Sequence, residues 1–214
     1  MSSKFFMSVL VPWSIFLPIV IGLFKFKLLP KNARIIWYYL LVSAVVNFAA
    51  SFIGRKLHAN NLPLIHIYTA IEGVLFCWFY KVTLQAPQKS LLFKLLPLLF
   101  VLACIINALF FQSIYTYSSY TRSIEAIFCI LFALNYFARA ATIDNKDKKM
   151  ILLPEFHFNT GIFLYFSGAF MLFVFSNFIF TLSDSDYYTV WVIHAGFVLC
   201  MYLFFSTAFL LCKK

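Results

Sequence analysis

Charged residues are scarce in this sequence. Only 11% of the 214 residues are charged, whereas 64% are hydrophobic and 21% are aromatic. A soluble domain usually carries about 25% charged residues, so this chain has too few of them to cover a folded surface in water. Lipid imposes no such requirement, because its hydrocarbon core favours apolar surface. The composition therefore predicts an integral membrane protein.

Glycine is also scarce, and the signatures of several functional classes are missing. Six glycines are few for a transporter built from broken helices, so we expect mostly continuous helices. The five cysteines form no C-x-x-C pair and lie in apolar stretches, which is typical of small buried side chains. We find no Gly-rich phosphate loop, dinucleotide fingerprint or Ser-His-Asp spacing. The last apolar stretch has no lysine before Lys213 that could carry retinal.

Seven apolar stretches are long enough to cross a membrane, which takes about 20 helical residues. Short polar or proline-containing segments separate them, so no loop has room for a soluble domain. We predict an all-α, polytopic membrane protein with seven transmembrane helices in a single domain, residues 1–214. No A-x-A-like cleavage site follows the first stretch, so we expect a retained helix rather than a signal peptide. The stretches are 5–24, 35–53, 62–81, 92–112, 118–138, 157–181 and 187–211.

The basic residues are divided unequally between the two sides that these helices define. One side holds thirteen of the 17 Lys and Arg residues, and the other holds Lys4, Arg55, Lys56 and Arg122. Because the side rich in Lys and Arg usually faces the cytoplasm, we expect an outside N-terminus and a cytoplasmic C-terminus in the inner or plasma membrane. This distribution accounts for the net charge of +10. The expected partners are the lipid bilayer and a cytoplasmic or membrane signalling protein. We expect no nucleic acid partner.

Three of the predicted helices resemble one another. In the third, fifth and seventh, a Tyr-Thr pair is followed within about one turn by an ionisable residue: Glu72, Glu125 and His194. The helices that precede them each carry one asparagine: Asn47, Asn107 and Asn177. The pattern is consistent with a triple helical-hairpin repeat after the first helix. Chance similarity between aromatic-rich apolar helices is the alternative explanation.

These ionisable and amide residues form a layer in the outer half of the predicted bundle. An ionisable residue at the centre of a membrane helix costs about 2.5–3.5 kcal/mol on insertion, so Glu72 and Glu125 should face the interior. Arg122 can pair with Glu125 on its own helix, which is a purely structural explanation. Glu72 should be protonated, hydrogen-bonded to Asn or Tyr, or paired with His194 or Arg122 across helices. The candidate ligand-binding residues are Glu72, Glu125, His194, His66, Tyr68, Asn47, Asn107, Asn177 and Arg122.

Two carboxylates with one or two histidines also suit Zn²⁺ or another divalent cation. No H-x-x-x-H or H-E-x-x-H motif places two ligands on one helix face, so any metal site must be assembled from three helices. If a metal binds, its expected ligands are Glu72, Glu125 and His194. The seven-helix hydrolases that include alkaline ceramidases and adiponectin receptors share the helix count. Their paired histidines in the last helix have one counterpart here, His194.

The segment LPLIHIYTAIE, residues 62–72, resembles a segment of small uncharacterised bacterial seven-transmembrane proteins. Some of those proteins accompany or precede sensor histidine kinases. The resemblance covers this helix, and the rest of the chain only in topology. It implies a sensory role without naming a ligand, and the matching positions are His66, Tyr68, Thr69 and Glu72.

We therefore expect a membrane sensor or receptor-like module that binds a small ligand or ion in a pocket in the outer half of the bundle. The carboxylates and His194 would bind, and the three asparagines would orient them. A role other than catalysis is favoured, and no cofactor is indicated. The alternatives are a small-solute or cation transporter and a metal-dependent membrane hydrolase. The transporter is less favoured, because the inner half of the predicted bundle has few polar residues that could form a path for a solute. They are Asn135, Ser206 and Thr207.

Overall fold

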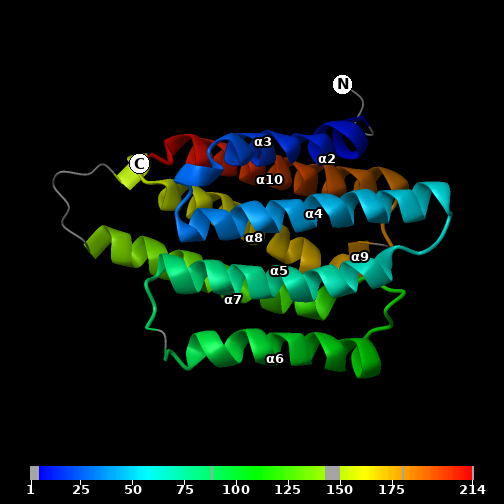
Figure 1. Ribbon diagram of the computed structural model, residues 1–214. Helices are drawn as coiled ribbons and strands as arrows, with labels where there is room; N and C mark the ends of the chain where they lie inside the picture. Colours follow the sequence, from blue (N-terminus) through cyan, green and yellow to red (C-terminus); the bar gives the residue numbers. More distant parts are fainter. Residues whose placement is uncertain (1–4, 88, 143–149, 180, 214) are drawn as a thin grey trace.

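The computed structural model describes residues 5–87, 89–142, 150–179 and 181–213. Within these ranges the chain forms helices joined by turns and loops, and no strand is present. Figure 1 shows long helices lying side by side along one axis. In chain order the elements are η1 (Phe6–Leu10), α2 (Val11–Ser14), α3 (Phe16–Phe24), η2 (Phe26–Leu28), α4 (Lys31–Lys56), α5 (Leu62–Thr83), α6 (Leu92–Ile106), η3 (Asn107–Phe111), α7 (Ser119–Thr142), η4 (Met150–Leu152), α8 (Pro154–Val174), α9 (Ser176–Ile179) and α10 (Asp184–Leu211).

The predicted number of membrane-spanning helices is confirmed for the described residues. Seven helical segments are long and apolar enough to cross a membrane. Many of their large apolar side chains are exposed; on α6, for example, Leu98 is 64% exposed. Such a surface suits lipid, whereas soluble monomers rarely expose large apolar patches. The segments are Phe6–Phe24, Lys31–Lys56, Leu62–Thr83, Leu92–Phe111, Ser119–Thr142, Pro154–Val174 and Ser185–Leu211.

Two helices, α4 and α8, differ most in their bounds from those expected from hydrophobicity alone. The second helix was expected over 35–53, but α4 begins at Lys31, directly after the extended Pro30. The sixth was expected over 157–181, but α8 begins with Pro154 in its first turn and ends at Val174. Proline suits the first turn of a helix, because the N–H that it lacks has no partner there. Both helices therefore start at proline signals, outside their apolar stretches.

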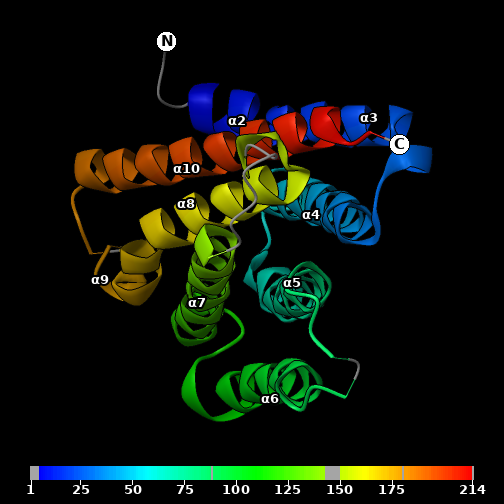
Figure 2. The same cartoon turned by 90° about the vertical axis from the view of Figure 1, so that its left-hand side faces the viewer.

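The spanning helices are arranged in pairs, with α6 alone at one edge (Figure 2). α10 lies between α3 and α8, α8 packs against α7, and α4 packs along α5. α6 packs mainly on α5 and has little contact with α7, its partner in the predicted hairpin repeat. The three predicted hairpins therefore pack differently from one another. Side chains from α4, α5, α7, α8 and α10 meet in the interior.

Aromatic side chains fill the centre of the bundle. Phe76 of α5 and Phe166 of α8 are buried and meet edge to face, with ring centroids 5.3 Å apart at 85°. The absence of a side chain at Gly73 lets the Phe100 ring of α6 approach α5, because a Cβ there would lie 2.2 Å from the ring. This aromatic layer lies between two polar regions. One surrounds Glu72 of α5, and the other is at the end of the bundle where α4 and α8 begin.

Candidate functional site

Glu72 occupies the interior near the midpoint of α5, and its side chain is fully hydrogen-bonded. The residue is 1% exposed. Its Oε1 accepts hydrogen bonds from the phenols of Tyr39 at 3.1 Å and Tyr68 at 2.9 Å. Its Oε2 accepts a hydrogen bond of 2.6 Å from Nη1 of Arg122 in α7. Of the arrangements that the sequence left open for Glu72, the structure thus has the pairing across helices with Arg122, supported by tyrosines.

Arg122 lies between two carboxylates. The same Nη1 lies 3.6 Å from Oε2 of Glu125, so the contact within α7 is looser than the contact to α5. The guanidinium carbon lies 5.5 Å from the ring centroid of Tyr68 and 5.7 Å from that of Phe173. Aromatic faces at this distance attract a cation. We call Tyr39, Tyr68, Glu72, Arg122 and Glu125 the Arg122 cluster.

Glu125 is buried without the hydrogen bonds that Glu72 has. It is 0% exposed, and within the described part of the chain neither carboxylate oxygen has a hydrogen-bond partner. Burying a polar group without such a bond is unfavourable, and burying an unpaired charge is more so. The cluster contains two carboxylates and one guanidinium, so full ionisation would leave one net negative charge in the bundle interior.

His194 of α10 lies beside the cluster, among aromatic rings rather than against a carboxylate. Its ring centroid is 5.4 Å from that of Trp191, 5.7 Å from that of Tyr165 and 5.9 Å from that of Phe173. Its Nδ1 has no hydrogen-bond partner among the described residues. Phe173 contacts both His194 and Arg122, and this ring therefore connects α10 to the cluster.

Aromatic residues also cover the cluster from the loop that precedes α7. Tyr117 meets Trp191 with ring centroids 6.3 Å apart. Burial raises the pKa of the Tyr117 phenol to about 12, against the lowering effect of the nearby Arg122 guanidinium. The phenol is therefore neutral at physiological pH. Tyr117, Trp191 and His194 thus lie in a row that encloses the cluster on this side.

The asparagines expected to orient the ionisable residues have other partners. Nδ2 of Asn47 donates to the backbone oxygen of Ser43 at 2.8 Å and to its hydroxyl at 3.2 Å. Nδ2 of Asn107 donates to Oε1 of Gln112 at 3.2 Å, at the end of the helix. Neither bond reaches Glu72 or Glu125. The side chain of Asn177 lies outside the described residues.

His66 faces away from the cluster. Its Nε2 lies 2.9 Å from the backbone oxygen of Thr116, and its side chain lines an apolar cavity of about 540 Å³ between α5 and α6. His66 and Glu72 lie six residues apart, which places them on different faces of the helix. Tyr68 is therefore the residue of this segment that accompanies Glu72 in the interior.

A second group of hydrogen-bonded side chains lies between the Arg122 cluster and the end of the bundle where α4 and α8 begin. The phenol of Tyr80 donates to Oδ1 of Asn159 at 3.0 Å, and Nδ2 of Asn159 donates to the backbone oxygen of Ala133 at 3.2 Å. These bonds join α5, α8 and α7. Tyr80 and Asn159 thus add one hydrogen-bonded pair to the few polar groups expected in this part of the bundle. A single asparagine in an apolar stretch gave too little signal to assign it to the core.

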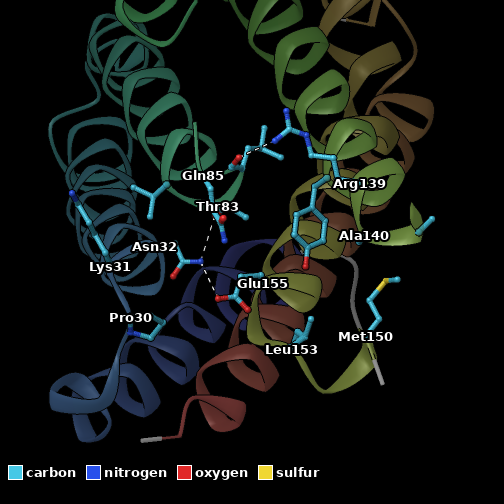
Figure 3. Close-up of a pocket in the computed structure, with 14 residues that line it drawn as sticks. Pro30, Lys31, Asn32, Thr83, Gln85, Arg139, Ala140, Met150, Leu153 and Glu155 are labelled. Atoms are coloured by element: carbon cyan, nitrogen blue, oxygen red, sulfur yellow. Dashed lines mark hydrogen bonds between the residues drawn. The ribbon is translucent and has the colours of Figure 1, made fainter. Parts of the chain in front are cut away.

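A cavity of about 700 Å³ opens at the end of the bundle where α4 and α8 begin. Figure 3 shows Asn32 of α4 between Thr83 and Glu155. Nδ2 of Asn32 lies 3.5 Å from Oγ1 of Thr83 and 3.2 Å from Oε1 of Glu155. On α7, Nη1 of Arg139 donates to the backbone oxygen of Leu84 at 2.9 Å. Sequence reasoning did not identify this site, because its residues lie at the ends of four different helices.

The residues proposed as metal ligands do not form a metal site in this structure. Within the described ranges, no three His, Cys, Asp or Glu side chains are grouped so that they could hold a metal ion. Glu72 and Glu125 instead share Arg122. Protein-family models, curated protein sequences and solved structures were compared with this chain, and none matches it.

Proposed function

We propose that this protein is a membrane sensor whose responsive element is the Arg122 cluster, and that it responds to a proton or a small cation. The observation that carries the proposal is the buried carboxylate of Glu125, which has no hydrogen-bond partner among the described residues. Two carboxylates face one guanidinium. A proton or cation at Glu125 would remove the excess negative charge.

Ionisable groups from several helices surround Glu125 and would influence its charge state. Arg122 opposes its negative charge, whereas Glu72 adds to it. Thiols and phenols from α5, α6, α7 and α8 contribute further dipoles. In the bundle interior such interactions are stronger than in water, because the effective dielectric constant is lower. The surrounding groups are Glu72, Arg122, Cys77, Cys104, Cys129, Tyr117 and Tyr165.

A change of charge at the cluster would reach five spanning helices. Tyr39 belongs to α4, Glu72 to α5, Arg122 to α7, Phe173 to α8 and His194 to α10. Neutralising Glu125 would release Arg122 from its second carboxylate and strengthen its pairing with Glu72. Switches of this kind work through a local change in charge that biases how packed elements are arranged. The proposed output is a shift of α7 relative to α8 and α10.

The same proposal includes an orientation and a partner. Following the distribution of Lys and Arg, the N-terminus would lie outside and the C-terminus in the cytoplasm, in the plasma or inner membrane. The cluster would then lie nearer the outer face. The resemblance of residues 62–72 to proteins found beside sensor histidine kinases supports a membrane or cytoplasmic signalling partner. The triple hairpin repeat would account for the three ionisable residues at similar depth.

A cation or solute transporter is the second candidate, favoured by the cavity of about 700 Å³ at the opposite end. Transport would require the cluster and the cavity to communicate. Between them α5 carries the buried side chains Phe76, Phe79 and Tyr80. The Tyr80–Asn159 hydrogen bond is the polar feature of this layer that a transport path would use. We favour the sensor because aromatic rings fill the intervening layer.

The experiment is a pH titration of the protein in lipid nanodiscs, read by the fluorescence of Trp191, which packs on His194. The Trp191 signal is the difference between the wild type and Trp191→Phe. We expect it to change with pH and to become flat in Glu125→Gln. Glu155→Gln, which removes a carboxylate at the other end of the bundle, is the matched control and should titrate like the wild type.

Two outcomes would contradict the sensor. A Trp191 signal that titrates equally in Glu125→Gln would remove Glu125 as the responsive group. Proton or cation flux in proteoliposomes, abolished by Glu125→Gln, would establish the transporter instead. Repeating the titration with Na⁺, K⁺ and a small organic ammonium at fixed pH separates a proton sensor from a cation sensor.

A further inference from the structure

The cavity at the inner end of the bundle is lined by charges of both signs. Lys31 contributes to the lining from the start of α4, Arg139 from the last turns of α7, and Glu155 from the start of α8. In Figure 3 the Lys31 side chain points away from Arg139. With all three ionised, the lining carries one net positive charge. The neighbouring segments at the same end add further cations: Lys25, Arg34, Lys81 and Lys89. An excess of positive charge around a cavity attracts small anions.

Arg139 bonds to a backbone oxygen and forms no ion pair with a side chain of the described residues. One of its Nη atoms donates to the backbone oxygen of Leu84, which fixes the plane of the guanidinium. A guanidinium has five N–H donors, and no ion pair is found for Arg139 among the described residues. Its other donors can therefore bind an oxyanion, for which the planar guanidinium is well shaped.

Glu155 limits how much negative charge the cavity accepts. Its carboxylate is held by Nδ2 of Asn32 at 3.2 Å, and Asn32 is buried against Thr83. The carboxylate thus stays in the lining, where it repels a second negative charge on a ligand. The remaining walls are largely apolar: Val82, Leu84, Ala140, Met150 and Leu153. A ligand that suits this cavity has one negative charge and an apolar part.

We propose that this cavity binds a phosphodiester monoanion that carries an apolar chain, with the phosphate at Arg139 and the chain against the apolar walls. The helix ends that form the cavity adjoin the basic segments, where anionic headgroups would gather if this end lies at a membrane surface. A membrane lipid and a soluble phosphodiester share the phosphodiester group, but the soluble compound lacks the apolar chain. This site is separate from the Arg122 cluster, and its test does not depend on the sensor proposal.

The test uses three probes with the full-length protein in a neutral detergent: lysophosphatidylglycerol, lysophosphatidylcholine and glycerophosphoglycerol. Binding is measured by native mass spectrometry and by the shift in the unfolding temperature. The first probe has the monoanion and the chain, the second has the chain with no net charge, and the third has the monoanion without the chain. We expect the first to bind at least about tenfold more tightly than either of the others.

Two variants locate the binding. Arg139→Gln removes the charge that would hold the phosphate and should weaken binding of lysophosphatidylglycerol about tenfold. Lys81→Gln removes a charge at the same end but outside the lining, so it should leave binding unchanged. Glu155→Gln keeps an acceptor for Asn32 and removes the repelling charge. It should improve binding of the dianionic lysophosphatidic acid.

Three results would overturn the proposal. Equal binding of lysophosphatidylcholine would mean that the chain alone is recognised. Equal binding of glycerophosphoglycerol would mean that the site takes a soluble phosphodiester and that the apolar walls are not used. Equal loss of binding in Arg139→Gln and Lys81→Gln would mean that the general positive charge of this end, and not the cavity, attracts the probe.

Discussion

Arg122 of α7 and Glu72 of α5 form a 2.6 Å ion pair in the interior of the bundle. Fifty residues separate them in the chain, and the whole of α6 lies between them in sequence. The pair therefore holds two spanning helices together without help from a short loop. Loss of Arg122 would leave two carboxylates without a cation, whereas loss of Glu72 would leave Arg122 with Glu125.

Removing Arg122 alone should be more damaging than removing the pair. Arg122→Gln leaves two carboxylates buried without a cation, and breaking one side of a buried ion pair costs about 3–5 kcal/mol. The double variant Arg122→Gln/Glu72→Gln should recover part of that loss. Reversible unfolding by SDS in mixed micelles measures the free energy. Arg55→Gln, on the exposed end of α4, is the control and should change little; a double variant less stable than Arg122→Gln would refute the pairing.

The two tyrosines on Glu72 should contribute comparably to stability. Tyr39→Phe and Tyr68→Phe each remove one hydrogen bond to the same carboxylate oxygen. We expect each to lower the free energy of unfolding by about 1–2 kcal/mol, since hydrogen bonds to charged groups are stronger than neutral ones. Tyr38→Phe, which alters a phenol on the exposed side of α4, should be neutral. The idea fails if all three variants unfold alike.

Two glycine-to-alanine variants should have opposite effects. At Gly73 a Cβ would lie 2.2 Å from the buried ring of Phe100, so α5 and α6 would have to separate. Overpacking of this kind costs about 1–3 kcal/mol. At Gly196 nothing lies within 4 Å of the added Cβ, and alanine is the better helix former by about 1 kcal/mol. Thermal unfolding in nanodiscs should show a lower midpoint for Gly73→Ala and an equal or higher one for Gly196→Ala.

The variant Gly73→Ala/Phe100→Leu tests the cause of the first effect. The smaller leucine side chain should leave room for the new methyl group and restore part of the stability. If the loss persists undiminished in the double variant, contact with the Phe100 ring is not its origin.

Buried and exposed asparagines should respond differently to leucine. Asn159→Leu leaves the Tyr80 phenol without its acceptor and removes the bond to the Ala133 carbonyl, which costs about 1–3 kcal/mol. Asn135→Leu, at an exposed position of α7, should be neutral or stabilising, because lipid favours the apolar side chain. Adding Tyr80→Phe to Asn159→Leu should cost less than the sum of the two single changes. Additive effects would exclude the hydrogen bond between them.

The residues of the Arg122 cluster could be identified from the sequence only in part. Glu72, Tyr68, Arg122 and Glu125 stand out because ionisable and aromatic polar groups are rare in spanning helices. Tyr39 gives no such signal, since tyrosine is common in this chain, and its role depends on how α4 is rotated against α5. Asn47 and Asn107 were expected at the same depth as the ionisable residues, but their side-chain amides donate hydrogen bonds to residues close in sequence. Depth along a helix can be read from sequence, whereas the direction around it cannot.

Hydrophobicity alone predicts the seven spanning helices, because crossing the hydrocarbon core needs a continuous run of about 20 apolar residues, which is a local property. Tertiary packing sets the closer pairing of Arg122 with Glu72 than with Glu125. It also makes the starts of α4 and α8 and the ends of α5 and α7 enclose a charged cavity. Both outcomes depend on which helices become neighbours and how each is rotated. Side-chain packing between distant segments sets those choices, and no local pattern encodes them.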